Sequence, residues 1–244
     1  MRGRRAARAP IWRLVPLSSE HFDVVVIGGG PAGYASALYG ASAGLNVALI
    51  EKGKIGGTCL NVGCIPAKEL LETATVFRTV QHADTFGVLA EAKGVDWSKT
   101  LARKQGIVDE LVGGGIGFLL KNRHVTVYDG IGTLNADHRS VSIAGGASGE
   151  LTVSGDAIVL AAGSDAPNDS WFPDRRTSDC HFRRAPVDPE LPTSAIVIGG
   201  GAIGEVCEFA SMMSDLGTKV TILEAAPSIL FSATRMSSRS LNGR

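Results

Sequence analysis

Two stretches of the chain repeat one order of apolar and glycine-rich segments. The first begins with the apolar run Phe22–Ile27, passes through GGGPAG at 28–33 and a run of small residues to Gly44, and ends with Val47–Ile50 before an acid. A continuous apolar run of this length is typical of a parallel strand buried on both faces. The order of strand, glycine turn, helix, strand and acid therefore predicts a βαβ unit that binds a dinucleotide.

Each glycine of the first unit has a separate physical role in such a site. Gly28 permits the tight turn, Gly30 lets the backbone approach a pyrophosphate, and Gly33 lets the helix pack closely on the strand. The N-terminus of the helix then presents unpaired N–H groups to the phosphates. Glu51 follows Gly28 by 23 residues, a spacing at which a carboxylate can accept a hydrogen bond from a ribose hydroxyl.

The second stretch has the same plan near the end of the chain. The apolar run 195–198 leads into a glycine turn, a helix to Gly217, the apolar run 220–223 and an acid. The residues that correspond to those of the first nucleotide site are Gly199, Gly201, Gly204 and Glu224. Its helix holds two more residues than the first, so we expect strain near 205–207. Two units predict two nucleotides and an α/β fold with two Rossmann-like βαβ units, each part of a three-layer ββα nucleotide-binding domain.

Between the two units, residues 125–163 hold short β-branched runs with intervening glycines, which favour short antiparallel strands. The run 157–160 predicts a buried strand that ends in a small-residue turn. Another glycine cluster, 113–117, follows a helical stretch rather than a strand. We therefore expect this cluster to mark close packing or a break between helices.

Overall composition narrows the classes of partner. The chain has 244 residues, with 24 Lys and Arg against 24 Asp and Glu, so bulk charge gives no support for nucleic-acid binding. No apolar run reaches 18 residues, and no membrane partner is expected. The first 19 residues carry five arginines and no acid, which fits either an unstructured extension or a transit peptide. A cytoplasmic location is expected, with the mitochondrial matrix as the alternative.

Cys59 and Cys64 form a C-x4-C pair. Five residues of a regular helix rise about 7.5 Å, whereas the Cα atoms of a disulfide lie within about 7 Å. At least one of the two must therefore lie outside regular helix, and Gly63 offers the freedom for a break. Pro66 suits a first helical turn, which would put Cys64 near a helix N-terminus and favour its thiolate.

Spacing alone leaves three interpretations of the pair open. The two residues form a redox-active disulfide, or are ordinary buried thiols, or contribute half of a zinc site. The zinc site is the least favoured, because the other cysteines are single and the histidines are scattered. No metal is expected.

The stretch 56–68, GGTCLNVGCIPAK, directly follows the first βαβ unit and resembles the redox-active motif of the pyridine nucleotide–disulfide oxidoreductase family. The resemblance covers about Phe22–Ser164 and Pro192–Leu230. Within the family it is nearest to the branch that oxidises dihydrolipoamide. The mercuric and glutathione reductase branches are alternatives.

This resemblance implies FAD on the first unit and NAD on the second. It implies that Cys59 exchanges with the substrate disulfide, that Cys64 is the flavin-facing thiolate, and that Lys68 lies near the flavin ring. The implied FAD contacts are Glu51, Lys52, Gly57, Thr58, Gly132, Ala162 and Gly163. Glu224 would hold the adenosine ribose, and its charge would repel a 2′-phosphate, which favours NAD over NADP.

The predicted organisation is an FAD-binding domain at 21–164 that contains the cysteine motif, an irregular linker at 165–190, and the start of an NAD-binding domain at 191–230. A disordered or targeting extension at 1–20 and an irregular tail at 231–244 flank them. The linker and the tail depart from the family pattern, which fits either natural divergence or an altered reading frame.

Chains of the family continue much further, into a dimerisation domain that supplies a catalytic His paired with a Glu. None of the five histidines here sits in such a motif. We therefore expect an N-terminal fragment, incomplete or inactive by itself, and a non-catalytic nucleotide-binding remnant is the alternative. For the intact enzyme the resemblance implies a homodimer, dihydrolipoamide or a similar dithiol as substrate, and a 2-oxoacid dehydrogenase complex as a candidate assembly.

Overall fold

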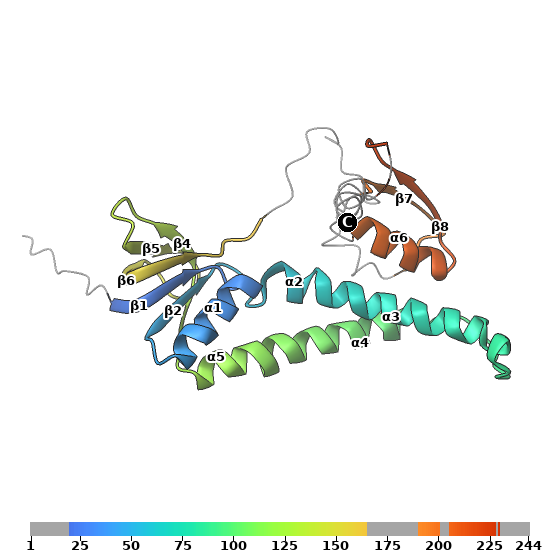
Figure 1. Ribbon diagram of the computed structural model, residues 1–244, viewed down its shortest axis with the longest axis horizontal. Helices are drawn as coiled ribbons and strands as arrows, with labels where there is room; N and C mark the ends of the chain where they lie inside the picture. The colour runs from blue at the N-terminus through green and yellow to red at the C-terminus, as the bar shows by residue number, and fades with distance from the viewer. Residues whose placement is uncertain (1–19, 165–189, 201–204, 228, 230–244) are drawn as a thin grey trace, which may run out of the picture.

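The structure, a computed structural model, describes residues 20–164, 190–200, 205–227 and 229 (Figure 1). The side chains of 205–207 are not described either, so the strain expected there lies outside the described residues. The same holds for most of the predicted extension, linker and tail.

The first βαβ unit is confirmed. Strand β1 (Glu20–Ile27) leads through the glycine turn into α1 (Pro31–Ser42), and β2 (Val47–Glu51) returns parallel to β1. Alternate residues of both strands enter two separate cores. Val25 and Ile27 contribute to one core, whereas Val26 contributes to the other. Burial on both faces is the physical reason why these strands read as continuous apolar runs.

One six-stranded sheet has the order β3-β2-β1-β6-β5-β4. Strand β3 (Thr126–Asp129) pairs parallel with β2, and β6 (Leu151–Leu160) pairs parallel with β1. Strands β4 (Ile131–Leu134) and β5 (Ser140–Ala144) complete the sheet through antiparallel pairing.

The expectation of only short antiparallel strands between the units is therefore wrong in two places. Strand β3 belongs to the parallel part of the sheet, and β6 is one long strand across the predicted run 157–160 and the segment before it. Gly155 does not interrupt β6, because it serves close packing rather than a turn. A Cβ on Gly155 would lie 2.9 Å from Cγ2 of Val25.

The two cores give the first domain its three layers. On one side of the parallel strands, Val141 and Ile143 of β5 pack against β1 and β2. On the other side, Ala37 of α1 and Leu120 of α5 (Phe118–Asn122) cover the same strands. The predicted α/β fold with a Rossmann-like, three-layer first domain is thus confirmed.

A long helical hairpin extends from this sheet (Figure 1). Its first arm comprises α2 (Gly57–Asn61), α3 (Cys64–Gln81) and the short 3-10 helix η1 (Ala83–Phe86). The second arm comprises α4 (Trp97–Asp109), the π-helix η2 (Glu110–Gly117) and α5, which follow one another without a gap.

The glycine cluster 113–117 therefore lies inside a helix that continues, and the expected break is wrong. The predicted close packing holds at Gly117, where a Cβ would lie 3.1 Å from the carbonyl oxygen of Val112, but not at Gly113, where it would meet no atom within 4 Å. The cluster instead forms most of a π-helix, in which glycine tolerates the wider turn.

The second unit contributes β7 (Ser194–Ile198), α6 (Glu205–Asp215) and β8 (Lys219–Leu223), with β7 and β8 parallel as predicted. Helix α6 packs along α3 through an apolar cluster of Leu70, Phe209 and Met212. The second unit is thereby joined to the helix that begins at Cys64. Among the described helices, none is both long enough and apolar enough to cross a bilayer.

Candidate functional site

The first glycine turn is so tightly closed that only glycine fits at two of its positions. Gly28 has φ +104°, and a Cβ there would lie 2.2 Å from the carbonyl oxygen of Ala161 at the end of β6. A Cβ on Gly33 would lie 1.7 Å from the carbonyl oxygen of Gly28. The roles predicted for Gly28 and Gly33, a tight turn and close helix packing, match this geometry.

Glu51 ends β2 and holds the turn through both carboxylate oxygens. Its Oε2 accepts a hydrogen bond from the backbone N–H of Gly29 at 2.6 Å, and its Oε1 accepts one from Gly53 at 2.7 Å. These two bonds orient the carboxylate beside the glycine turn. Each oxygen keeps a further lone pair for a ribose hydroxyl.

The N-terminus of α1 suits a phosphate group. Gly30 is the N-cap residue, no side chain caps the helix, and Pro31 lies in its first turn. The first N–H groups are thus left to an external acceptor. Gly57 lies against Gly30, since a Cβ on Gly57 would come within 2.7 Å of the Gly30 Cα. This cradle of backbone fits the diphosphate of FAD, for which side chains would leave no space.

The other predicted FAD contacts lie in different surroundings. Lys52, Thr58 and Ala162 are exposed, and Gly163 has φ +73° with open space around it. Gly132 lies on β4, where a Cβ would meet Cγ2 of Ile50 at 3.1 Å in the core. These cofactor contacts remain predictions.

The prediction omitted Gly130, two residues before Gly132, whose N–H donates to the carbonyl of Glu51 at 3.0 Å. Gly130 is buried and links β3–β4 to the end of β2. The sequence signal was available, because Asp129-Gly130 is a common turn pair between two apolar runs.

The two cysteines come together across a break between helices, as the spacing predicts. Cys59 lies in α2, which ends at Asn61, and Cys64 is the first residue of α3. The break is closed by the N–H of Gly63, which donates to the carbonyl oxygen of Thr58 at 2.7 Å. Both cysteines are free thiols in this structure.

The environments of the two thiols differ. Cys59 is partly buried, whereas Cys64 is exposed at the N-terminus of an 18-residue helix. Burial, first, and then a hydrogen bond and the charge of Cys64 together raise the pKa of Cys59 to about 11. Lys68 acts in the opposite direction on the same pKa. Cys59 is thus held mainly as the neutral thiol near pH 7, while the thiolate expected at Cys64 stays a prediction.

Tyr34, in the first part of α1, belongs to the same cluster and was missed from the sequence. Its pKa is raised, first by burial and then by the nearby charges of Cys59 and Cys64. A large aromatic residue within the small-residue run PAGYASA was the available signal. Side chains of three helices are therefore coupled by charge: Tyr34 of α1, Cys59 of α2 and Cys64 of α3.

Lys68 forms an ion pair with a residue of the second unit. Its Nζ lies 3.4 Å from Oε1 of Glu208 on α6, and the lysine side chain is 62% exposed. This pair connects the cysteine-bearing helix to the second βαβ unit. Sequence reasoning missed Glu208, because 140 residues separate the partners and no local pattern joins them.

The second unit repeats the carboxylate geometry of the first. The carboxylate of Glu224 accepts hydrogen bonds from Gly200 and, through Oε1 at 2.7 Å, from Ala226. These backbone N–H groups, Ala226 first, hold the pKa of Glu224 below its usual value. Gly199 has φ +99°, as a tight turn requires. The predicted sites Gly201 and Gly204 lie outside the described residues.

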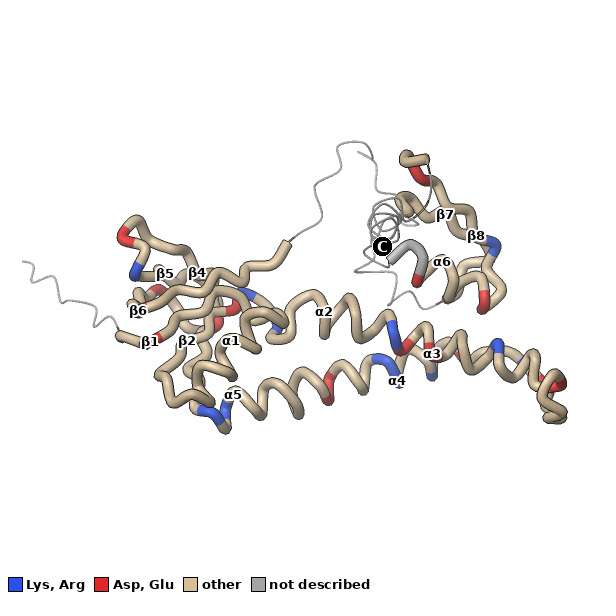
Figure 2. The backbone as a smooth tube through the Cα atoms, in the orientation of Figure 1, with Lys and Arg blue, Asp and Glu red and all other residues tan. Residues whose placement is uncertain are grey.

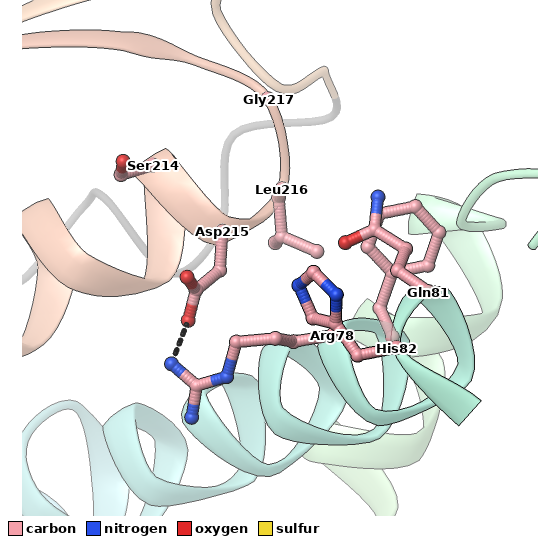
Figure 3. A pocket seen from close by; sticks show the side chains of 8 residues that line it. Arg78, Gln81, His82, Ser214, Asp215, Leu216 and Gly217 are labelled. Carbon is pink, nitrogen blue, oxygen red and sulfur yellow. Dashed lines mark hydrogen bonds and ion pairs between the residues drawn. The ribbon is translucent and has the colours of Figure 1, made fainter. Parts of the chain in front are cut away.

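Two further features of the described chain bear on the chemistry. No group of three or more His, Cys, Asp or Glu residues within it could hold a metal ion. A cavity between α3 and α6, lined by Arg78, His82 and Leu216 among others, lies near the end of α3 farther from Cys64 (Figure 3). The cavity is therefore separate from the cysteine pair.

Comparisons with known proteins agree with this geometry. A family model described as pyridine nucleotide-disulphide oxidoreductase matches residues 22–242. The chain is 41% identical over 216 residues to a dihydrolipoyl dehydrogenase of Bacillus subtilis, covering 85% of this chain and 44% of the relative. It is 36% identical over 225 residues to a dihydrolipoyl dehydrogenase of Acholeplasma laidlawii, covering 87% of this chain and 62% of that one.

Among solved structures, the chain is similar to the copper(II) complex of RclA, an HOCl-induced flavoprotein disulfide reductase from Escherichia coli. The TM-score is 0.67 at 31% sequence identity, covering 86% of this chain and 44% of that one. In each of these comparisons the chain spans less than two thirds of the length of its relative.

Proposed function

The chain belongs to the pyridine nucleotide-disulphide oxidoreductase family, and on that premise we propose that it carries the cofactor sites and the redox-active pair of a flavoprotein that oxidises dihydrolipoamide with NAD. The similarity to dihydrolipoyl dehydrogenases supports this substrate. The observation that carries the proposal is the position of the cysteines. Gly57, two residues before Cys59, packs directly on the glycine turn that forms the first nucleotide site.

In this proposal FAD binds to the first unit. The backbone of Gly28, Gly30 and Gly33 forms the cradle for its diphosphate, and Glu51 accepts from its ribose. When bound, the flavin supplies two-electron transfer between the thiols and a nicotinamide. Residues of α2 and α3 place the cysteine pair beside that site, and Lys68 lies one helical turn after Cys64.

The exchange itself needs only the cysteines and the substrate. One thiolate of dihydrolipoamide attacks Cys59 in the oxidised pair, so the Cys59–Cys64 bond breaks and Cys64 leaves as a thiolate. The second substrate thiol displaces Cys59, passes its proton to that cysteine and closes the lipoamide disulfide, so the pair ends as the Cys59 thiol and the Cys64 thiolate. Two electrons have then passed to the cysteines. The pKa of about 11 for Cys59 in the dithiol fits a thiol that retains the proton after exchange.

The second unit would bind NAD. Glu224 is held in the same orientation as Glu51, with both carboxylate oxygens on backbone N–H groups. A carboxylate there can accept from a ribose 2′-hydroxyl and repels a 2′-phosphate. This arrangement favours NAD over NADP.

For the intact enzyme we propose a homodimer that acts on dihydrolipoamide or a similar dithiol, with a 2-oxoacid dehydrogenase complex as a further partner. A cytoplasmic location is proposed, with the mitochondrial matrix as the alternative.

The two glutamates provide a matched test. Glu51→Gln should weaken FAD binding about tenfold, because one charged acceptor of the site is lost, and should leave NAD binding unchanged. Glu224→Gln should weaken NAD binding by a similar factor and leave FAD binding unchanged. FAD is followed by quenching of its fluorescence, and NAD by isothermal titration calorimetry.

Equal effects of either variant on both nucleotides would contradict the assignment of one nucleotide to each unit. Turnover is then measured as NADH formation from dihydrolipoamide. Tight FAD binding without any reduction of the oxidised Cys59–Cys64 pair by dihydrolipoamide would leave a nucleotide-binding protein and refute the redox part of the proposal.

A further inference from the structure

A serine, a histidine and an aspartate lie in contact near the start of β1. Nδ1 of His21 lies 3.0 Å from Oγ of Ser154, and Nε2 of the same ring lies 3.3 Å from Oδ1 of Asp156. The register of the sheet produces this arrangement. His21 of β1 is paired with Ser154 of β6, and Asp156 projects from the same face of β6 because it follows Ser154 by two residues.

One tautomer of the neutral imidazole satisfies both contacts. The carboxylate of Asp156 only accepts, so Nε2 must carry the hydrogen and donate it. Nδ1 then accepts a hydrogen bond from the hydroxyl of Ser154. A base that is hydrogen-bonded to a hydroxyl and held by a carboxylate is the arrangement of a Ser-His-Asp triad, here with the roles of the two ring nitrogens exchanged.

We propose that Ser154 is a nucleophile for acyl transfer, with His21 as its general base and Asp156 as the group that orients the imidazole. The substrate class is a small carboxylic ester with a good leaving group. The side chains of His21 and Asp156 are 58% and 67% exposed. Such an open site is accessible to a small ester but offers little surface to hold a larger one.

The reaction proceeds in two balanced steps. Oγ of Ser154 attacks the carbonyl carbon, and its proton passes to Nδ1 of His21. His21 then gives that proton to the leaving oxygen as the ester bond breaks and the acyl-serine remains. Water attacks the acyl-serine by the same route, and the proton returns through His21 to Ser154. The sum is the hydrolysis of one ester bond by one water molecule, and Asp156 stabilises the imidazolium that forms in each step.

The cluster is separate from the nucleotide and cysteine sites. His21 lies seven residues before Gly28, about 23 Å along the strand. Figure 2 shows acidic and basic residues together at this end of the sheet, beside β5 and β6. The inference therefore goes beyond the proposed function, and either of the two can fail without the other.

Ser140 provides a control within the same chain. It is paired with Ser154 across β5 and β6, so the two side chains project from the same face of the sheet. The hydroxyl of Ser140 donates to Oδ2 of Asp137 at 2.7 Å and accepts from Nδ2 of Asn135 at 2.9 Å. The partner that receives its hydrogen is thus a carboxylate rather than an imidazole. Hydrogen bonds, that of the Arg139 N–H first, hold the pKa of Asp137 below its usual value, which makes this carboxylate a weak base.

The experiment treats the full chain with p-nitrophenyl acetate at pH 8. Its cysteines are first blocked with iodoacetamide, because thiols would take up the acetyl group themselves. Peptide-resolved mass spectrometry follows the acetyl group on each serine, and absorbance follows the release of p-nitrophenolate. Ser154 should be acetylated about 100-fold faster than Ser140, at the low end of what a general base contributes because the site is exposed.

Four variants separate the roles. His21→Gln should slow the acetylation of Ser154 by about 100-fold. Asp156→Asn should slow it by about tenfold, because the ring keeps a hydrogen-bond partner but loses a charged one. Ser154→Ala should remove the acetyl group from this peptide and lower the release of p-nitrophenolate. Ser140→Ala is the matched control and should leave the rate at Ser154 unchanged.

Acetylation of Ser154 no faster than that of Ser140 would overturn the proposal, and so would an unchanged rate in His21→Gln. Either result would mean that the three residues only hold β1 against β6. If a variant fails to fold, the comparison of the two serines in the unaltered chain decides. The assay contains no flavin, NAD or dithiol, so its outcome is independent of whether the chain oxidises dihydrolipoamide.

Discussion

Three glycines of the first βαβ unit permit a quantitative test by substitution. In this unit glycine is required for two separate reasons, a positive φ and close backbone contact. Gly28 has both, since its φ is +104° and a Cβ would lie 2.2 Å from a carbonyl oxygen. Gly33 has only the contact, at 1.7 Å, and Gly44 has only the positive φ, +86°, with open space around it.

The expected losses in free energy of unfolding follow from these two causes. A left-handed conformation costs an alanine about 1–2 kcal/mol, which is the whole effect expected for Gly44→Ala. Overpacking adds about 1–3 kcal/mol, because the atoms in the way are backbone and cannot rotate aside. Gly28→Ala should therefore lose about 2–5 kcal/mol. Gly33→Ala should lose about 1–3 kcal/mol from contact alone.

Urea unfolding followed by circular dichroism separates the three. With a slope of about 2 kcal/mol per molar urea, each kcal/mol shifts the midpoint by about 0.5 M. The Gly28 variant should unfold at the lowest urea concentration, and its shift should approximate the sum of the other two. Equal shifts for Gly28→Ala and Gly44→Ala would refute the reasoning, because they would mean that the end of β6 does not press against Gly28.

Two further predictions concern the cysteines and the join between the units. Burial comes first among the causes that raise the pKa of Cys59, and the hydrogen bond and charge of Cys64 come next. Cys64→Ala should therefore move the pH midpoint of Cys59 alkylation below 11, and the midpoint should stay above that of an exposed thiol. An unchanged midpoint would show that burial alone sets the pKa of Cys59. Leu70 is fully buried between α3 and α6, whereas Val76 on the same helix is 54% exposed. Leu70→Ala should lower the free energy of unfolding by about 2–5 kcal/mol, and Val76→Ala should lower it by less than about 0.5 kcal/mol, as measured by chemical unfolding. Similar losses in the two variants would contradict the packing of α6 on α3.

Local sequence predicts much of this fold, because its signals act over short distances. Both βαβ units were read from apolar runs that end in glycine turns, and β1, α1 and β2 lie where the runs place them. The break between Cys59 and Cys64 followed from helix geometry and the reach of a disulfide alone.

The errors arose where pairing partners are distant in sequence. Whether Thr126–Asp129 pairs parallel with β2 or antiparallel with a neighbour depends on residues 78 positions earlier. Gly155 looks like a turn in isolation, yet it is a contact point for Val25 of β1. The glycines of 113–117 likewise gave no sign that the helix continues through them.

The sequence by itself therefore determined the two βαβ units, the redox-type cysteine spacing and the acids at the ends of β2 and β8. These features depend on the conformational limits of residues within one turn or one strand. Only the tertiary structure decided which groups surround the cysteines. Tyr34 of α1 feels the charges of both thiols, Glu208 of α6 pairs with Lys68 after Cys64, and no local preference encodes a contact between helices. Such contacts form because the burial of apolar faces, such as that of Leu70 with Phe209, packs the helices together. The charged residues of these helices are thereby placed near one another.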